Sequence, residues 1–213
     1  MDKRILEERK KRAQIIIKEL KKLFPIAKTA LNYSTPLELL FAVILSAQAT
    51  DKLVNKVTAN LFQKYKTLDD YVAADPEKFT KDISSVNFYR NKAKNILATA
   101  KILKEKYNGK IPDTMEELLT LPGVARKTAN VILSTVYNKA DGVVVDTHVK
   151  RLSKLYGLTD YEDPVKIEND LIQILPREER RDFSFRMIDY GRAYCMAKPH
   201  DHANCPLVKV LGE

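Results

Sequence analysis

The sequence predicts an all-α protein, and three observations lead to that class. Residues that favour helices are abundant, glycine contributes only 6 of the 213 residues, and no segment alternates apolar and polar residues as a half-buried strand does. Apolar residues recur instead at helical spacing, in segments that end at Pro, Gly or Asn. A chain of this length can bury one good core or two small ones.

Composition limits the classes of function. Hydrophobic residues at 45% and charged residues at 31% are typical of globular proteins. The net charge of +9 favours an anionic partner, although charge alone does not identify nucleic acid. The longest apolar run, residues 37–45, is too short to span a membrane, so no membrane partner is expected. Two cysteines and the lack of a hydrophobic signal core predict an intracellular location, in the cytoplasm or nucleoid.

Helix starts and stops are readable along the first half of the chain. Residues 1–24 predict a basic amphipathic helix that docks through its apolar stripe and leaves its lysines in solvent. Residues 35–38 combine a Thr cap, a Pro and a Glu, and the helix they open is apolar all round, so it should lie at the centre of a core. Asp51 or Thr50 is expected to cap the next helix, and two short helices are expected to start at Thr67 and Asp75. A longer helix is expected over residues 89–107, with its lysines on the outer face.

The stretch from residue 113 to residue 148 carries the strongest functional pattern. Asp113, with Glu116 three residues later, predicts a capping box that opens a short helix. Pro122 and Gly123 then break the chain before a second helix over residues 125–137. Amides at the start of that helix lack intrahelical acceptors and lie at the positive end of its dipole, which suits a phosphate. Three later helices are expected, over residues 146–157, 163–175 and 178–192.

A resemblance rests on two motifs. Leu-Pro-Gly-Val-Ala-Arg-Lys-Thr-Ala-Asn-Val at residues 121–131, followed by Val-Asp-Thr-His at 145–148, resembles the endonuclease III family of DNA glycosylase/AP lyases. Residues 45–51, Leu-Ser-Ala-Gln-Ala-Thr-Asp, are similar to a second stretch of the same family. The likeness covers nearly the whole chain. It implies two helical domains with a DNA-binding cleft between them and a helix-hairpin-helix motif: residues 29–139 as a helical barrel, and residues 1–28 plus 140–213 as the second domain. The implied partner of this expected monomer is double-stranded DNA containing damaged bases or abasic sites.

The chemistry implied by the resemblance centres on Lys127 and Asp146. Removing a damaged base breaks a bond at C1′ of deoxyribose, and a neutral amine can attack that carbon and remain as a Schiff base. A lysine is ordinarily charged at neutral pH, but a helix N-terminus and a partly desolvated cleft favour its free amine. Asp146 is expected to accept the proton, to stabilise the cationic sugar, or both. It also reads as an ordinary helix cap, and the two interpretations are compatible.

Other residues are implied to contact DNA. Gln48 is expected to fill the hole left by a flipped nucleotide, and Phe88 to wedge into the base stack, a position where the family more often has an aliphatic residue. The alternative for Phe88 is that it packs into the core. His148 is a further candidate for DNA contact, and its role is expected to be structural rather than catalytic. The remaining candidates lie along the hairpin: Leu121, Gly123, Val124, Ala125, Arg126 and Thr128.

The chain departs from the family pattern at two places. The family usually has glycine where this chain has Ala125; alanine would cost on the order of 1 kcal/mol at a positive φ. We favour the case in which Ala125 is already the first helical residue and the alanine is harmless. At the C-terminus the family usually has four cysteines, spaced six, two and five residues apart, that hold a four-iron four-sulfur cluster. This chain has Cys195, His202, Cys205 and Leu211 there, so no cluster is predicted.

The cysteines and histidines of this C-terminal loop leave two interpretations open. Cys195, His200, His202 and Cys205 number four possible zinc ligands. From sequence alone we favour a degenerate cluster loop that holds no metal. Its hold on the second domain then comes from apolar contacts, made by Pro206, Leu207, Val208 and Leu211.

The predicted function is that of a bifunctional DNA glycosylase/AP lyase of base excision repair. It is expected to remove oxidised or otherwise damaged pyrimidines from duplex DNA and to cleave the abasic site by β-elimination through a lysine Schiff base. One alternative is a mismatch-specific, monofunctional glycosylase of the same superfamily, which Lys127 argues against because such relatives lack this lysine. The other alternative is a non-catalytic protein that uses the helix-hairpin-helix only to bind DNA.

Overall fold

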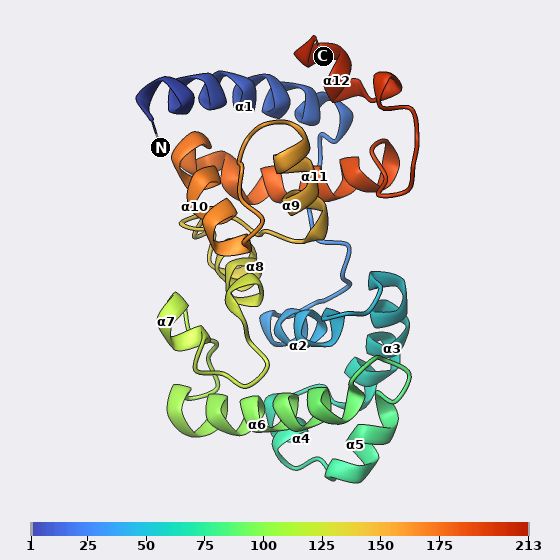
Figure 1. Cartoon of the computed structure of the whole chain (residues 1–213). Coiled ribbons are helices and arrows are strands. Elements are labelled where there is room, and N and C mark those ends of the chain that lie inside the picture. Colours follow the sequence, from blue (N-terminus) through green and yellow to red (C-terminus); the bar gives the residue numbers. More distant parts are fainter. Residues whose placement is uncertain (1, 213) are drawn as a thin grey trace. The chain divides into compact units, whose positions relative to one another are not determined.

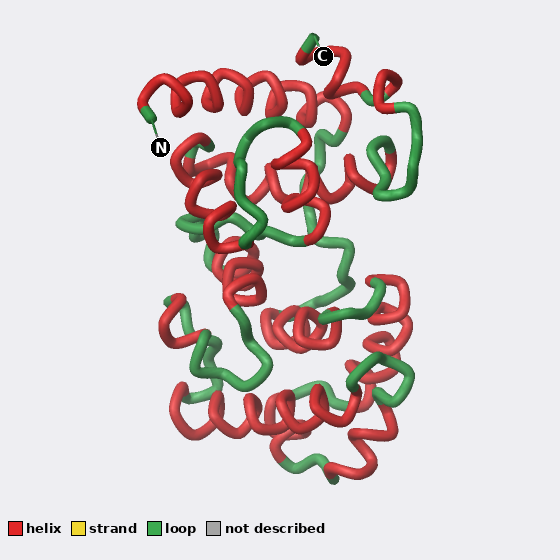
Figure 2. Tube along the Cα trace, viewed as in Figure 1, coloured by secondary structure: helices red, strands yellow, loops and turns green. Residues whose placement is uncertain are grey.

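Helices make up all the regular structure that the computed structural model describes, residues 2–212 (Figures 1 and 2). The prediction of an all-α protein is confirmed; its first helix was expected to include Met1, which lies outside the described residues. The chain divides into two compact units, Thr29–Asn138 and Met1–Lys28 with Lys139–Glu213. Across the described range, no helix is long and apolar enough to cross a membrane.

The unit Thr29–Asn138 is built around α2. All residues from Leu39 to Leu45 are buried, and α2 packs against α3, α6 and α8 (Figure 1). A capping box starts the helix, with the hydroxyl of Thr35 accepting from the amide of Glu38. The helices of the unit are α2 (Pro36–Ser46), α3 (Asp51–Lys64), α4 (Leu68–Val72), α5 (Pro76–Asp82), α6 (Tyr89–Tyr107), α7 (Met115–Leu118) and α8 (Arg126–Val136).

The other unit joins the two ends of the chain. Ala13, Ile16 and Leu20 on the apolar stripe of α1 are fully buried in its core, and α1 packs against α10, α11 and α12. The N-terminal helix therefore docks as its amphipathic pattern predicts. The helices of this unit are α1 (Lys3–Leu23), α9 (Thr147–Leu155), α10 (Pro164–Ile174), α11 (Arg180–Ala193) and α12 (Pro206–Leu211), with short 3₁₀ turns at Arg177–Glu179 and His202–Asn204.

Besides the start of α8, described below, two helix starts differ from the sequence prediction. The cap of α7 is Thr114, which accepts from the amide of Glu117, and not Asp113 with Glu116. Adjacent capping residues, each followed three positions later by a glutamate, fit the pattern equally well, so the pattern alone could not choose between them. Helix α12 was not expected. Pro206 at its first position and the partly buried Val208 and Leu211 on its apolar face explain why it forms.

Candidate active site

The hairpin turn ahead of α8 is a type II β-turn. The amide of Val124 donates to the carbonyl of Leu121 at 3.1 Å, and Gly123 at the third position has φ +80°. A Cβ on Gly123 would lie only 3.1 Å from Asn95 and 3.3 Å from Ile44. Both the backbone conformation and the lack of space therefore require glycine at this position.

The start of α8 lacks a side-chain cap. Ala125 is the N-cap, with an extended backbone at φ −96° and ψ 171°, and no side-chain cap bond is present at this helix start within the described chain. Because φ is negative, alanine causes no strain there. Ala125 was expected to be the first helical residue, but it is the residue before it, the N-cap. The amides of the first turn have no acceptor within the helix and lie at the positive end of its dipole. This end of α8 can receive a phosphate oxygen.

Lys127 is the second residue of α8, and its side chain is exposed beside that helix start. Thr128 follows it and is half-buried. Leu121 and Val124 are buried under the turn, with 2% and 7% of their surface exposed. These two residues thus support the hairpin from below, so any contact they make with DNA must come from their backbone.

Asp146, in the other unit, is the N-cap of α9. Its Oδ1 accepts from the amide of Val149 at 2.8 Å, and its side chain is half-buried. His148, the second residue of α9, lies against α11: a Cβ on Gly191 would come within 2.6 Å of its Nδ1. That packing supports the structural role expected for His148. The cap bond fixes the direction of the Asp146 carboxylate.

The structure brings together the two loops that carry Gln48 and Phe88. Both residues have left-handed backbones, with φ +54° and +57°, and both side chains are exposed. The side-chain amide of Asn87 donates to the carbonyl of Gln48 at 2.8 Å, which joins the loops. The side chain of Phe88 is 61% exposed, so the alternative in which it packs into the core is wrong. Left-handed backbone is uncommon for residues other than glycine and is enriched at functional sites.

Lys92 is a positioning residue that the sequence prediction missed. The lysines of α6 were expected on its outer face, but Lys92 is only 5% exposed. Its ammonium donates to the carbonyls of Leu45 and Ala47 at 2.8 and 2.6 Å, which holds the end of α2 and the turn that presents Gln48. Burial lowers the pKa of Lys92. The sequence did hold a signal for this burial: Lys92 lies four residues before the buried Ile96 and therefore on the same face of α6.

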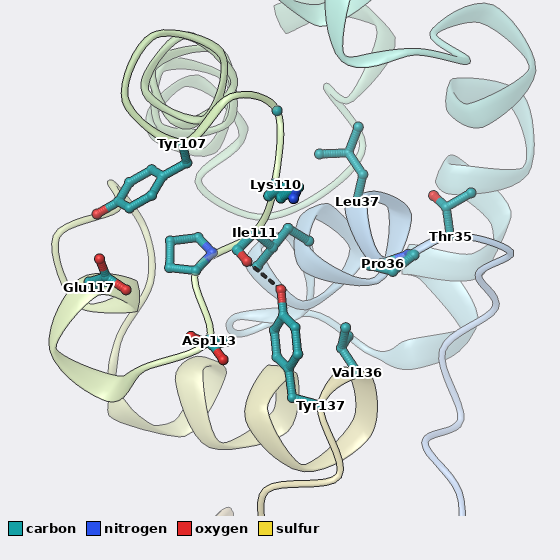
Figure 3. A pocket seen from close by; sticks show the side chains of 12 residues that line it. Thr35, Pro36, Leu37, Tyr107, Lys110, Ile111, Asp113, Glu117, Val136 and Tyr137 are labelled. Atoms are coloured by element: carbon teal, nitrogen blue, oxygen red, sulfur yellow. Dashed lines mark hydrogen bonds between the residues drawn. The ribbon is translucent and has the colours of Figure 1, made fainter.

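A surface pocket in the unit Thr29–Asn138 lies apart from these residues (Figure 3). It has a volume of about 680 Å³ and is lined by the start of α2, the Gly109–Asp113 segment and the end of α8. The hydroxyl of Tyr137 donates to the carbonyl of Ile111 at its wall. Its lining includes none of the candidate catalytic or DNA-contacting residues, so we do not assign the reaction to this pocket.

Comparison with known proteins identifies the family. Residues 41–177 match the model of the HhH-GPD superfamily base excision DNA repair proteins. Endonuclease III of Synechocystis sp. is 48% identical over 204 residues, which cover 96% of this chain and 93% of that protein. This chain belongs to the endonuclease III family. Endonuclease III of Bacillus subtilis is 43% identical and covers 95% of this chain, with 93% of its own length matched. The chain is accordingly a DNA glycosylase/AP lyase of base excision repair, as the resemblance implied.

Solved endonuclease III structures share the fold. A non-covalent endonuclease III–DNA complex and a trapped endonuclease III–DNA covalent intermediate each match with a TM-score of 0.89 and 44% identity over 94% of both chains. A thermostable thymine-DNA glycosylase matches with a TM-score of 0.80 at 20% identity, which shows a common fold and no more. The identity to endonuclease III therefore outweighs the alternatives of a mismatch-specific glycosylase and of a non-catalytic DNA-binding protein.

Proposed function

We propose that this member of the endonuclease III family removes damaged, in particular oxidised, pyrimidines from duplex DNA with Lys127 as the nucleophile and Asp146 as its partner carboxylate. The observation that carries the proposal is the place of Lys127, exposed at the second position of α8 beside uncapped first-turn amides. A backbone phosphate bound by those amides is covalently linked to a deoxyribose, so the sugar is held close to the amine. DNA seated there also excludes water from a side chain that is exposed in the free protein.

Two features of one solved endonuclease III structure support this proposal. One endonuclease III structure is described as a trapped covalent intermediate with DNA, and an enzyme nucleophile is what forms such a bond. The same structure is described as an estranged-adenine complex. An adenine without its partner is what remains opposite a pyrimidine that has been taken out of the helix, which favours a pyrimidine as the target.

The proposed reaction has three bond-breaking steps. The Nζ lone pair of Lys127 attacks C1′, and the glycosidic bond breaks with its electron pair leaving on the base. The C1′–O4′ bond then opens to give a Schiff base between Nζ and C1′. Loss of a C2′ proton expels the 3′ phosphate by breaking the C3′–O3′ bond, and water later hydrolyses the imine. Asp146 accepts the amine's proton or stabilises the positive charge at C1′, with Oδ1 held by Val149 and Oδ2 left to face the sugar.

We further propose that the adjacent loops occupy the gap left by the flipped nucleotide. Gln48 offers donors and acceptors to the orphaned base, and Phe88 inserts its exposed ring into the stack. The bonds from Asn87 and Lys92 hold this pair in position before DNA arrives. The hairpin at Gly123 binds phosphate through backbone amides and reads no sequence, as damage search along DNA requires.

Borohydride trapping tests the nucleophile. Duplex DNA with one oxidised pyrimidine is incubated with protein and borohydride, and covalent complexes are separated on a denaturing gel. The wild type should be trapped, Lys127→Ala should not, and Lys101→Ala, which alters an exposed lysine of α6, is the matched control. Base release by Lys127→Ala without trapping would favour activated water as the nucleophile. Trapping of Lys127→Ala at the wild-type rate would refute the assignment.

A further inference from the structure

The loop between α11 and α12 gathers four metal-binding side chains. The thiols of Cys195 and Cys205 and the imidazoles of His200 and His202 place one ligand atom each within 4.8 Å of all the others. Sγ of Cys195 is 3.7 Å from Nδ1 of His202, and Sγ of Cys205 is 3.3 Å from Nε2 of His200. Both cysteines are buried, and both are free thiols. These groups converge on one point although they come from different parts of the loop.

We propose that this loop binds one Zn²⁺ ion through Cys195, His200, His202 and Cys205. In a tetrahedral site with Zn–S bonds of about 2.3 Å and Zn–N bonds of about 2.0–2.1 Å, neighbouring ligand atoms lie roughly 3.3–3.8 Å apart. Both sulfur–nitrogen distances above fall in that range, and the widest separation in the cluster needs a contraction of only about 1 Å. A set of two sulfur and two nitrogen ligands is typical of zinc or of an iron–sulfur centre.

The four-iron four-sulfur cluster implied by the family resemblance does not fit these residues. Such a cluster takes four thiolates, and the whole sequence has 2 cysteines. A two-iron cluster with mixed ligands puts two cysteines on one iron and two histidines on the other, which separates the pairs. Here each sulfur lies beside a histidine nitrogen, and the set fits around a single ion.

Neighbouring groups prepare the ligands for a metal. Nδ1 of His200 is 2.9 Å from the carbonyl of Lys198, so it carries the proton and donates, which leaves the Nε2 lone pair for the ion. Arg151 donates to the carbonyl of Cys195 at 2.6 Å, and its guanidinium also lies 3.7 Å from the Cys195 sulfur. Two of the four ligands, His200 and Cys195, are thus held in place by neighbouring groups.

The role of the ion is structural. Four protein ligands fill a tetrahedral zinc ion and leave no position for water or substrate. Cys195 follows Tyr194, the C-cap of α11, and Cys205 is the N-cap of α12, so the ion ties the two helices together. Leu207 of α12 is fully buried in the core that α1 shares. Zinc therefore adds a second attachment of this loop to its domain, beside the apolar contacts expected from the sequence.

Metal analysis of the full chain tests the proposal. Protein from zinc-supplemented medium is desalted under reducing conditions, and zinc and iron are measured by elemental mass spectrometry. The wild type should carry one zinc per chain and no iron. His202→Ala removes an exposed ligand with little risk to folding, and it should lower the zinc content at least tenfold. Lys198→Ala, which changes an exposed side chain and keeps the carbonyl, should retain the zinc.

Cobalt replacement supplies a second readout that is independent of DNA cleavage. Co²⁺ added to metal-free protein should give the intense visible bands of tetrahedral, thiolate-bound cobalt, and His202→Ala should weaken them. Chelation should also lower the melting temperature of the wild type and leave that of His202→Ala unchanged. The proposal is overturned if the reconstituted wild type binds no stoichiometric zinc, if it contains iron with sulfide, if the cysteines form a disulfide under these conditions, or if His202→Ala retains its zinc.

Discussion

Asp146 has two roles in the proposed mechanism, and two substitutions separate them. As a cap, its Oδ1 accepts from the amide of Val149 at 2.8 Å. As a reactant, its negative charge serves the amine and the sugar. Asparagine keeps a side-chain oxygen for the cap and removes the charge, whereas alanine removes both. Comparing Asp146→Asn with Asp146→Ala therefore measures the cap and the charge independently.

The expected stability changes follow from the cap bond. Asparagine caps helices about as well as aspartate, while alanine in place of either costs about 1 kcal/mol, within a range of roughly 0.5–2 kcal/mol. For a chain of this size, 1 kcal/mol lowers the melting temperature by about 2–4 °C. Asp146→Ala should show that decrease in a thermal unfolding experiment, and Asp146→Asn should melt close to the wild type.

The expected catalytic changes follow from the charge. A positioned acid or base contributes about 10²–10⁴-fold to a rate, so both variants should lose at least about a hundredfold in base release and strand cleavage. Single-turnover assays with excess protein measure the chemical step apart from binding. If Asp146→Asn cleaves DNA at the wild-type rate, the carboxylate does no chemistry and only the cap remains. If Asp146→Asn loses both activity and thermal stability, the substitution does not separate the two roles, and our argument fails.

Two further substitutions test how the loops are held. Gly123→Ala should lower the free energy of unfolding by about 1–3 kcal/mol, because φ is +80° and the new Cβ would lie 3.1 Å from Asn95; an unchanged urea midpoint would contradict this. Lys92→Met should cost about 1–3 kcal/mol at neutral pH, because it leaves the buried carbonyl of Leu45 without its donor. Burial lowers the native pKa of Lys92 below the unfolded value of about 10.4, so the unfolded state binds the proton more tightly. The free energy of unfolding of the wild type should therefore increase as pH rises from the native pKa of Lys92 to its unfolded pKa. Urea titrations over this pH range should show the increase in the wild type and not in Lys92→Met. If the free energies of unfolding of the two proteins change in parallel with pH, this account is refuted.

Local chemistry made much of the fold and part of the site predictable. The capping box of Thr35 and Glu38, the glycine turn at Gly123 and the cap at Asp146 each depend on residues within a few positions of one another. Such patterns are visible in a sequence because the chain segment supplies both partners of the interaction. Where two such patterns overlapped, as at Thr114 and Asp113, the sequence did not decide between them.

Interactions between distant segments were not visible in the same way. Lys92 is buried because carbonyls at the end of α2, more than forty positions earlier, accept its hydrogen bonds. The left-handed backbones of Gln48 and Phe88 carry no glycine or asparagine signal, and the bond from Asn87 that joins their loops spans 39 positions. The convergence of the zinc ligands likewise depends on the fold of a loop that has no periodic pattern.

The uncapped start of α8 has a consequence for how this protein and DNA stabilise each other. A serine or aspartate in place of Ala125 would strengthen the free helix by about 1 kcal/mol, but its oxygen would compete with the phosphate for the same amides. Under our proposal, a phosphate of the DNA takes the place of the side-chain cap that this helix start lacks. Folding of the hairpin and affinity for DNA are then thermodynamically linked, so bound DNA should raise the melting temperature of the protein.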